Sequence, residues 1–278
     1  MSPRLDRNAR LLGLEGVERL LASHVVVLGL GGVGSFTAEA LARAGVGRLT
    51  LVDGERVDET NANRQLHALE GEFGRFKADV LAERLRRAAP HARIDAECRP
   101  YGPATAAELV AREASFVVDA MDTVVAKLHA IARCLDLGVP VVTVLGAARR
   151  LDPTSVQITD LCESHTDQLA KDVRKYLRRR HGISATAPLG VLAVWSPESP
   201  RPPVSLPGDE EGIPGTRGAA EGRRAPKCFG SVAFVTGAFG LAAAAAVVQR
   251  LCGAFPDGLP AVGEKEQARR RKRPARRP

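Results

Sequence analysis

Short apolar runs alternate with stretches of helical periodicity between residues 24 and 145. The apolar runs have the length and composition of buried strands, and the stretches between them space apolar side chains three and four positions apart. This alternation predicts an α/β fold with a parallel sheet covered on both faces. The predicted strands are His24–Leu30, Arg48–Asp53, Ala92–Cys98, Ser115–Ala120 and Pro140–Leu145, and the predicted helices are Ser35–Ala44, Lys77–Ala88, Glu108–Arg112 and Lys127–Leu137.

The pattern changes after Leu145. Ser155–Asp160 has the two-residue period of a half-buried strand, and Asp167–His181 is a basic amphipathic helix. Residues 197–227 are rich in Pro and Gly, which predicts a flexible loop. We interpret these segments as a C-terminal extension of the same domain, so that one domain spans residues 1–253 around a core of residues 24–145.

The stretch Cys228–Gln249 contains no charged residue over 22 positions. That length is sufficient for a transmembrane helix. Its side chains are mainly Ala and Gly, with few Leu or Ile, and this composition favours a helix packed in the protein core. Association with a membrane is left open but is not favoured.

The formal net charge of +8 is concentrated at the C-terminus, because residues 262–278 contain eight Lys or Arg and two Glu. We interpret residues 254–278 as a basic disordered tail that either aids solubility or contacts nucleic acid or anionic lipid. The five cysteines form no C-x-x-C pair, which argues against a zinc site. Their odd, scattered arrangement is typical of a reducing compartment, so we expect a cytoplasmic protein.

A glycine-rich turn connects the first predicted strand to the first predicted helix. Glycine lets the backbone approach a phosphate closely, and the amides that begin the following helix then face the anion. Asp53 ends the second predicted strand, where a carboxylate accepts hydrogen bonds from ribose hydroxyls. The pattern predicts a nucleotide site on a Rossmann-like, doubly wound sheet, and it fits NAD as well as ATP. The glycines of the turn are Gly29, Gly31, Gly32 and Gly34.

Polar side chains beyond the second and later strands favour ATP over NAD. The carboxyl ends of the strands converge on one crevice in a doubly wound sheet. A triphosphate with Mg²⁺ requires several cations and a carboxylate, whereas a dinucleotide with two phosphates does not. The residues expected in this crevice are Asn61, Arg64, Gln65, Lys77, Asp119 and Asp122.

Together these residues resemble the ThiF and MoeB adenylyltransferases of the ubiquitin-activating-enzyme superfamily. Segments in the second half of the chain, such as Asp152-Pro153-Thr154 and Val194-Trp195-Ser196-Pro197-Glu198, are similar to its tRNA-modifying branch, the threonylcarbamoyladenosine dehydratases. ThiF- and MoeB-like members usually carry two C-x-x-C zinc pairs, and their absence here favours the same branch.

The resemblance implies a function and a role for each residue. The enzyme would use ATP and Mg²⁺ to adenylate the carboxylate of threonylcarbamoyladenosine in tRNA, and the activated group would cyclise with net loss of water. Asp53 would hold the ribose and Asp122 the Mg²⁺. The phosphates would meet the backbone of Gly29, Gly31, Gly32 and Gly34 and the side chains of Asn61, Arg64, Gln65 and Lys77. The implied catalytic residues are Arg64, Lys77, Asp122 and Arg10, the last donated by the partner subunit of a homodimer.

Plainer interpretations of several residues stay open. Lys77 suits a solvated helix position, Asp119 a strand cap and His67 a structural role. Cys162 and Cys228 are candidate thioester nucleophiles, although an isolated cysteine is more often a small core residue.

Two other functions share parts of this pattern. An activating enzyme for a small ubiquitin-like sulfur-carrier protein would perform the same adenylation on a protein substrate. An NAD-dependent dehydrogenase would use the same glycine turn, but it does not require the polar run Asn61–Gln65. The expected partners are tRNA and a second copy of the chain. A sulfur-transfer partner protein and a peripheral membrane location are left open.

Overall fold

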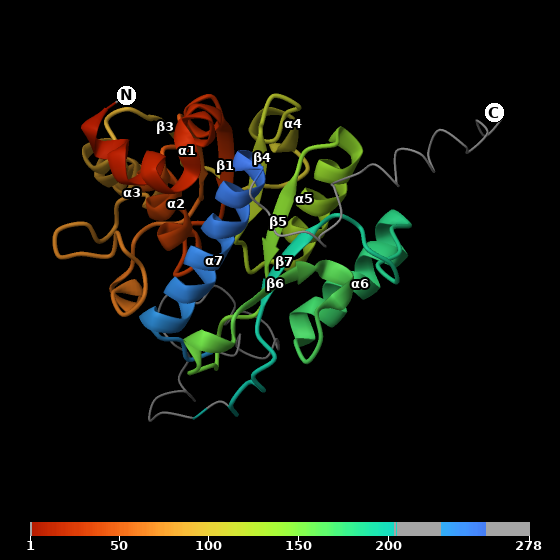
Figure 1. Ribbon diagram of the computed structural model, residues 1–278. Helices are drawn as coiled ribbons and strands as arrows, with labels where there is room; N and C mark the ends of the chain where they lie inside the picture. Colours follow the sequence, from red (N-terminus) through yellow and green to blue (C-terminus); the bar gives the residue numbers. More distant parts are fainter. Residues whose placement is uncertain (1, 203, 205–228, 254–278) are drawn as a thin grey trace.

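The computed structural model describes residues 2–202, 204 and 229–253. Its centre is a seven-stranded sheet in the order β3-β2-β1-β4-β5-β7-β6, and within it β6 alone runs antiparallel to its neighbour (Figure 1). This is the Rossmann-like, mainly parallel sheet that the sequence predicts. The strands are β1 (His24–Leu28), β2 (Arg48–Val52), β3 (Arg93–Glu97), β4 (Phe116–Asp119), β5 (Val141–Val144), β6 (Gln157–Asp160) and β7 (Leu192–Trp195).

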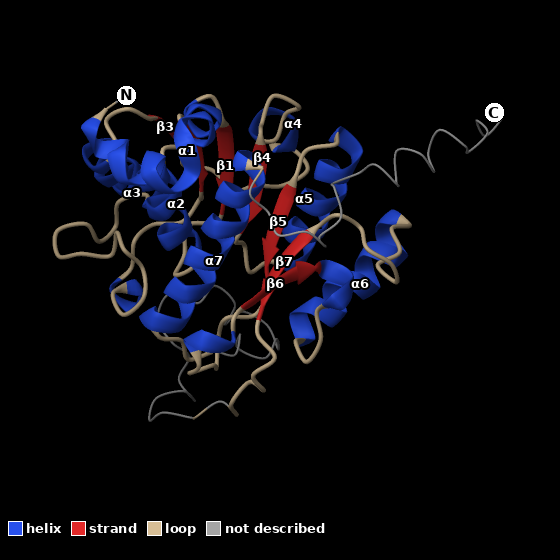
Figure 2. Cartoon of the chain, viewed as in Figure 1, coloured by secondary structure: helices blue, strands red, loops and turns tan. Residues whose placement is uncertain are grey.

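Helices cover both faces of the sheet (Figure 2). One apolar cluster packs α1, α2, α3 and α7 against one face, and a second packs α4, α5 and α6 against the other. Apolar strand residues point to both faces, as expected for a sheet that is buried on both sides. The helices are α1 (Asp6–Leu21), α2 (Gly34–Ala44), α3 (Lys77–Ala88), α4 (Ala106–Leu109), α5 (Val124–Leu137), α6 (Gln168–His181) and α7 (Ala233–Cys252).

Three elements differ from the sequence prediction. The helix expected at Glu108–Arg112 is the single turn α4, which ends at Leu109 because the chain becomes extended at Val110. Helix α1 was not predicted, since charged residues interrupt its apolar positions and Gly13 (φ 75°) kinks it. Strand β7 was not predicted either, because its four residues are too short a run to show a period.

Helix α7 covers most of the uncharged stretch, beginning at Ala233 and continuing through Arg250 to Cys252, and it packs against α2. Its glycines allow this approach, because a Cβ on Gly240 would lie 2.5 Å from the Val33 carbonyl oxygen. Thr37 Oγ1 donates to the Gly240 carbonyl at 3.0 Å across the same contact. Among the described residues, this is the one helix that is long and apolar enough to cross a membrane, and half of its most apolar window is buried in the fold. The observed packing agrees with the predicted core helix.

Two predicted segments fall wholly or largely outside the described residues. The basic tail at 254–278 lies outside them, and so does most of the loop predicted at 197–227. Residues 197–202 are described and contain neither helix nor strand, as expected.

Candidate nucleotide-binding site

The glycine turn lies where β1, β2 and β4 end, at the carboxyl edge of the sheet. It leaves β1 at Gly29 (φ 86°) and enters α2 at Gly34. A Cβ on Gly34 would lie 1.8 Å from the Gly29 carbonyl oxygen, so only glycine closes this turn. Near Gly31 the nearest heavy atom to such a Cβ is 3.9 Å away, on Gln65. The turn is therefore tight at its ends and open at Gly31, which leaves room for a phosphate at the N-terminus of α2.

Asp53 follows β2 and holds the glycine turn through a hydrogen bond to its backbone. Its carboxylate accepts hydrogen bonds from the Leu30 N–H at 2.7 Å and from the Glu55 N–H at 2.8 Å. Burial raises the pKa of this carboxyl, while the two backbone hydrogen bonds and nearby Lys77 oppose the rise. Asp53 thus orders the turn, in addition to the ribose role that the sequence predicts.

The run Asn61–Gln65 folds over the turn, and part of it is occupied in holding its own shape. Asp58 caps the short helix Glu59–Asn61, and Asn61 Oδ1 accepts from the Asp58 N–H at 3.2 Å. Arg64 Nη1 donates to the Thr60 carbonyl and to Asn63 Oδ1, each at 2.9 Å. The Arg64 side chain also borders the glycine turn, since a Cβ on Gly32 would lie 3.1 Å from Arg64 Cγ.

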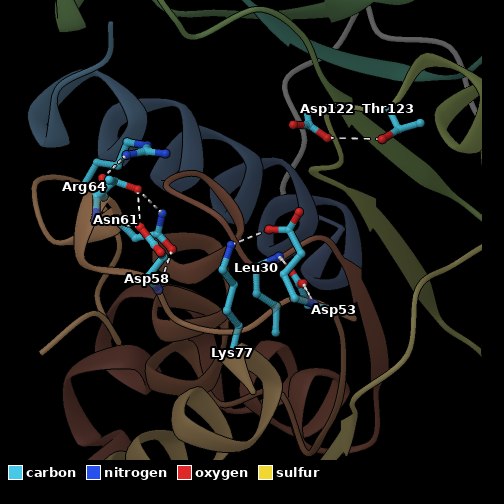
Figure 3. Close-up of polar contacts among 10 residues, drawn as sticks. Leu30, Asp53, Asp58, Asn61, Arg64, Lys77, Asp122 and Thr123 are labelled. Atoms are coloured by element: carbon cyan, nitrogen blue, oxygen red, sulfur yellow. Dashed lines mark hydrogen bonds and ion pairs between the residues drawn. The ribbon is translucent and has the colours of Figure 1, made fainter. Parts of the chain in front are cut away.

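Lys77 is buried at the start of α3, with 5% of its side chain exposed. Its ammonium pairs with Glu55 at 2.6 Å, and 76% of the Glu55 side chain is exposed. A solvated surface lysine is therefore the wrong interpretation. The cation sits beside Asp53 and points into the site, with one exposed carboxylate as its counter-ion (Figure 3).

Two buried side chains near Lys77 lack hydrogen-bond partners. Gln65 is 6% exposed and its Oε1 accepts no bond, while His67 is 1% exposed and neither ring nitrogen is bonded. Burial and the Lys77 charge lower the pKa of His67 to about 4, so its imidazole is neutral at pH 7. His67 therefore serves as an uncharged neighbour of Lys77, in line with a structural role.

The two aspartates at the end of β4 have different surroundings. Asp119 is fully buried and pairs with Lys127 of α5 at 2.8 Å. Asp122 is exposed, and its only hydrogen bond among the described residues is from Thr123 Oγ1 at 3.3 Å. Figure 3 shows Asp122 across the site from Lys77 and Asp53. Only Asp122 keeps a carboxylate free for an external ligand, as the sequence interpretation favoured.

The donor set fits Mg²⁺ in the form that accompanies a nucleotide. Among the described residues, no group of three or more His, Cys, Asp or Glu side chains could hold a metal by itself. Mg²⁺ at phosphate-transfer sites is bound by one or two carboxylates with substrate oxygens and water, and the exposed carboxylate of Asp122 is of this kind.

Sequence reasoning missed two features that border this site. Lys127 lies on the buried face of α5 together with Ile131 and Cys134, and a lysine at an apolar position of the helical pattern was the available signal. The start of α7 also reaches the site, where Asn63 Nδ2 donates to the Ser231 carbonyl at 2.8 Å. Thr236 Oγ1 would lie 3.1 Å from a Cβ on Gly32. No local pattern predicts a contact between segments so far apart in sequence.

Cys162 and Arg10 lie apart from these contacts. Burial, followed by a hydrogen bond to Asp160, raises the pKa of Cys162 to about 12, which argues against a thiolate nucleophile. Cys228 is outside the described residues. Arg10 lies on α1 with 74% of its side chain exposed and pairs with Asp6 at 2.9 Å. Its donation to a partner subunit stays a prediction.

The fold and the site define a nucleotide-binding α/β protein with a phosphate-facing glycine turn and two cations beside it. Residues 5–273 match the ThiF family over nearly the whole chain. The chain belongs to the ThiF family.

Several relatives carry the name tRNA threonylcarbamoyladenosine dehydratase. The tRNA threonylcarbamoyladenosine dehydratase of Bacillus subtilis is 44% identical over 200 residues, which cover 72% of this chain and 77% of that protein. The Escherichia coli enzyme of the same name is 36% identical over 253 residues, which cover 89% of this chain and 93% of that protein. Structures of the E. coli enzyme with ATP and with AMP superpose with TM-scores of 0.77 and 0.79, at 35% identity over 90% of this chain and 94% of theirs.

Proposed function

We propose that this chain is an ATP-dependent tRNA threonylcarbamoyladenosine dehydratase. One observation carries the proposal: the chain is 36% identical across 93% of the E. coli enzyme of that name. The glycine turn, Asp53, Arg64 and Lys77 support it, because they form a site suited to a nucleoside triphosphate.

The proposed reaction has two steps. An oxygen of the threonylcarbamoyl carboxylate attacks the α-phosphorus of ATP, the bond to the β-phosphate oxygen breaks, and pyrophosphate leaves. A nitrogen of the ureido group then attacks the carbonyl carbon of the acyl-adenylate. The bond to AMP breaks, the nitrogen loses its proton, and a ring forms. The substrate has then lost one water, whose elements are accounted for by the cleavage of ATP.

Lys77 and Arg64 supply the positive charge that this chemistry requires. Negative charge builds on the phosphate oxygens as pyrophosphate departs, and preorganised cations in a partly buried site stabilise it. Lys77 is held in place by Glu55, whose exposed carboxylate is free to move aside for an incoming phosphate. Arg64 is held by the Thr60 carbonyl and keeps its remaining N–H groups for the nucleotide.

Asp53 and Asp122 serve the two ends of the nucleotide in this proposal. Asp53 holds the ribose with carboxylate lone pairs beyond those that accept from Leu30 and Glu55. Asp122 holds Mg²⁺, which neutralises phosphate charge when bound. Asn61 and Gln65 complete the phosphate contacts by donating from their side-chain N–H groups, and the buried Oε1 of Gln65 would accept from an N–H or O–H group of the substrate.

The working unit in this proposal is a homodimer in which Arg10 reaches the partner's site. Arg10 is exposed, and its ion-pair partner is Asp6 on the same helix. The side chains beside it on α1 are apolar and solvent-facing: Leu11 is 84% exposed and Leu14 64% exposed. Exposed apolar side chains of this size are characteristic of a contact surface.

We place the enzyme in the cytoplasm, where its tRNA substrate resides, and leave a sulfur-transfer partner as an open proposal.

Mass spectrometry of tRNA tests the function directly. The protein is incubated with ATP, Mg²⁺ and tRNA that carries threonylcarbamoyladenosine, and the nucleosides are then analysed. Loss of one water from the modified nucleoside, dependent on ATP, is the expected result. The control reaction contains tRNA without the modification, and no pyrophosphate should be released from ATP in it. If folded protein that binds ATP leaves the modified nucleoside unchanged but catalyses ATP–pyrophosphate exchange that depends on a ubiquitin-like carrier, the proposal is wrong.

A further inference from the structure

Helix α6 has a strongly basic outer face that the proposed site does not use. Its fourteen residues contain one acid, Asp172, and six Lys or Arg. The opposite face packs Ala170, Val173 and Leu177 into the core beside α5. Five of the cations are exposed, namely Lys171, Lys175, Arg178, Arg179 and Arg180.

These five cations differ from most exposed arginines on the other helices, because they lack counter-ions. Arg19, Arg43 and Arg84 each pair with a glutamate. None of the five on α6 forms an ion pair with any residue that the structure describes. A helix dipole favours cations in the last turn, but it does not account for Lys171 and Lys175 in the first two turns.

Buried polar contacts fix the N-terminus of α6 to the segment that follows β5. Its cap residue Asp167 accepts from the Ala170 N–H at 2.7 Å and pairs with buried Arg150 at 2.8 Å. Arg150 in turn donates to the Gly146 carbonyl at 2.8 Å, just beyond the end of β5. The basic face therefore begins at the carboxyl edge of the sheet, where the nucleotide site lies, and extends along the outside of the molecule (Figure 1).

We propose that the exposed face of α6 binds the phosphate backbone of the tRNA substrate. The surface offers five unpaired cations along a helix of roughly 21 Å, at a rise of 1.5 Å per residue. Tyr176 lies among them, with Lys175 Nζ 5.3 Å and Arg180 Cζ 5.2 Å from its ring, so the surface combines cations with an aromatic platform. This inference rests on the proposed function, in which the modified nucleoside of the tRNA occupies the crevice. Helix α6 would then contact another part of the same tRNA.

An anionic membrane is the other polyanion that a basic helix can meet. Interfacial helices bury exposed Trp, Phe or Leu side chains in the lipid. No large apolar side chain of α6 is exposed, and Leu177 is fully buried. The charge pattern and the missing apolar anchor therefore favour RNA.

The test compares two double variants with the same loss of charge. Lys175→Gln with Arg179→Gln removes two cations from α6. Arg87→Gln with Arg112→Gln removes two exposed cations elsewhere. Affinity for threonylcarbamoyladenosine-containing tRNA is measured by fluorescence anisotropy at several salt concentrations, and kcat and KM for tRNA are measured by pyrophosphate release.

The α6 variant should bind tRNA about tenfold more weakly, and its plot of log affinity against log salt should be shallower by roughly two. Its KM for tRNA should rise while kcat at saturating tRNA and the Kd for ATP stay unchanged. The control variant should match the wild type. Equal tRNA affinity, salt slope and KM in the two variants would overturn the α6 proposal.

The remaining outcomes separate this inference from the proposed function. If wild-type protein does not dehydrate the nucleoside but its tRNA affinity still depends on α6, the surface is supported and the function is wrong. If the α6 cations govern flotation with vesicles rich in anionic lipid and leave tRNA affinity unchanged, the surface is a membrane surface and the inference is wrong.

Discussion

Lys127 and Asp119 form a 2.8 Å ion pair in which both side chains are fully buried, beneath the carboxyl end of β4. The ammonium also reaches Thr143 Oγ1 at 3.2 Å and the Val144 carbonyl at 3.0 Å on β5. One helix side chain therefore joins the ends of two neighbouring strands. The segment that carries Asp122 leaves the sheet at this point. The ion pair therefore helps to fix the position of the Asp122 backbone.

Lys127→Met should destabilise the fold severely. The substitution leaves the Asp119 carboxylate buried without its cation, and loss of one partner of a buried pair lowers the free energy of unfolding by about 3–5 kcal/mol. Urea unfolding followed by circular dichroism measures this loss. The exposed Lys175→Met is the matched control and should change stability by less than about 0.5 kcal/mol. A Lys127→Met protein as stable as that control would contradict the structural role of the pair.

Lys77→Met should reduce turnover by roughly 100-fold or more, because it removes a preorganised cation from the site of phosphate transfer. Glu55→Gln is its control: it removes the partner that holds Lys77 but leaves the cation in place. Isothermal titration with ATP and steady-state pyrophosphate release measure both. Equal damage from the two substitutions would show that the salt bridge matters, and that the lysine does not act on the nucleotide.

Asp122→Ala should abolish ATP-dependent turnover, by at least about 100-fold, and leave the fold intact. The side chain is exposed and makes one weak contact, with Thr123, so its removal costs little stability. The measurement is turnover as a function of Mg²⁺ concentration, with Glu113→Ala, an exposed carboxylate elsewhere, as control. Undiminished turnover in Asp122→Ala would remove this residue from the metal role.

A mixture of two inactive variants should regain activity if Arg10 acts in the partner's site. Arg10→Ala and Asp122→Ala impair the same composite site from different subunits. After subunit exchange, each mixed dimer contains one intact site, so an equimolar mixture should recover about one quarter of wild-type activity. Turnover of the mixture, compared with each variant alone, is the measurement. No recovery despite verified exchange would place Arg10 outside the partner's site.

His67 should make the protein less stable as the pH falls from about 6.5 to about 4. Its imidazole has a lowered pKa of about 4 in the fold, whereas the unfolded chain binds the proton near pH 6.5. The unfolded state therefore gains protons first, and the full loss below pH 4 is about 3 kcal/mol. The pH dependence of urea unfolding tests this, with His67→Gln expected to lack that part of the loss and the exposed His165→Gln expected to keep it. Identical pH profiles for wild type and His67→Gln would contradict the assignment.

The local sequence pattern determined much of the sheet and of the glycine turn. The strands and helices between residues 24 and 145 could be predicted because the sheet is buried on both faces. Its strands are therefore apolar runs, and its covering helices space apolar side chains three and four positions apart. The glycine turn could be predicted because its close backbone contacts exclude a side chain, as at Gly34, so glycine must appear in the sequence at that position. The preference for Asp122 over Asp119 as the free carboxylate also came from the sequence.

Only the tertiary structure decided what surrounds those residues. Lys77 has the sequence context of a solvated lysine, yet it is buried near Asp53 and His67 and pairs with Glu55. Lys127 pairs with Asp119, and Asn63 meets Ser231, through contacts between segments distant along the chain. The physical reason is that backbone periodicity is a local property, whereas burial and charge pairing depend on which distant segments the sheet topology brings together.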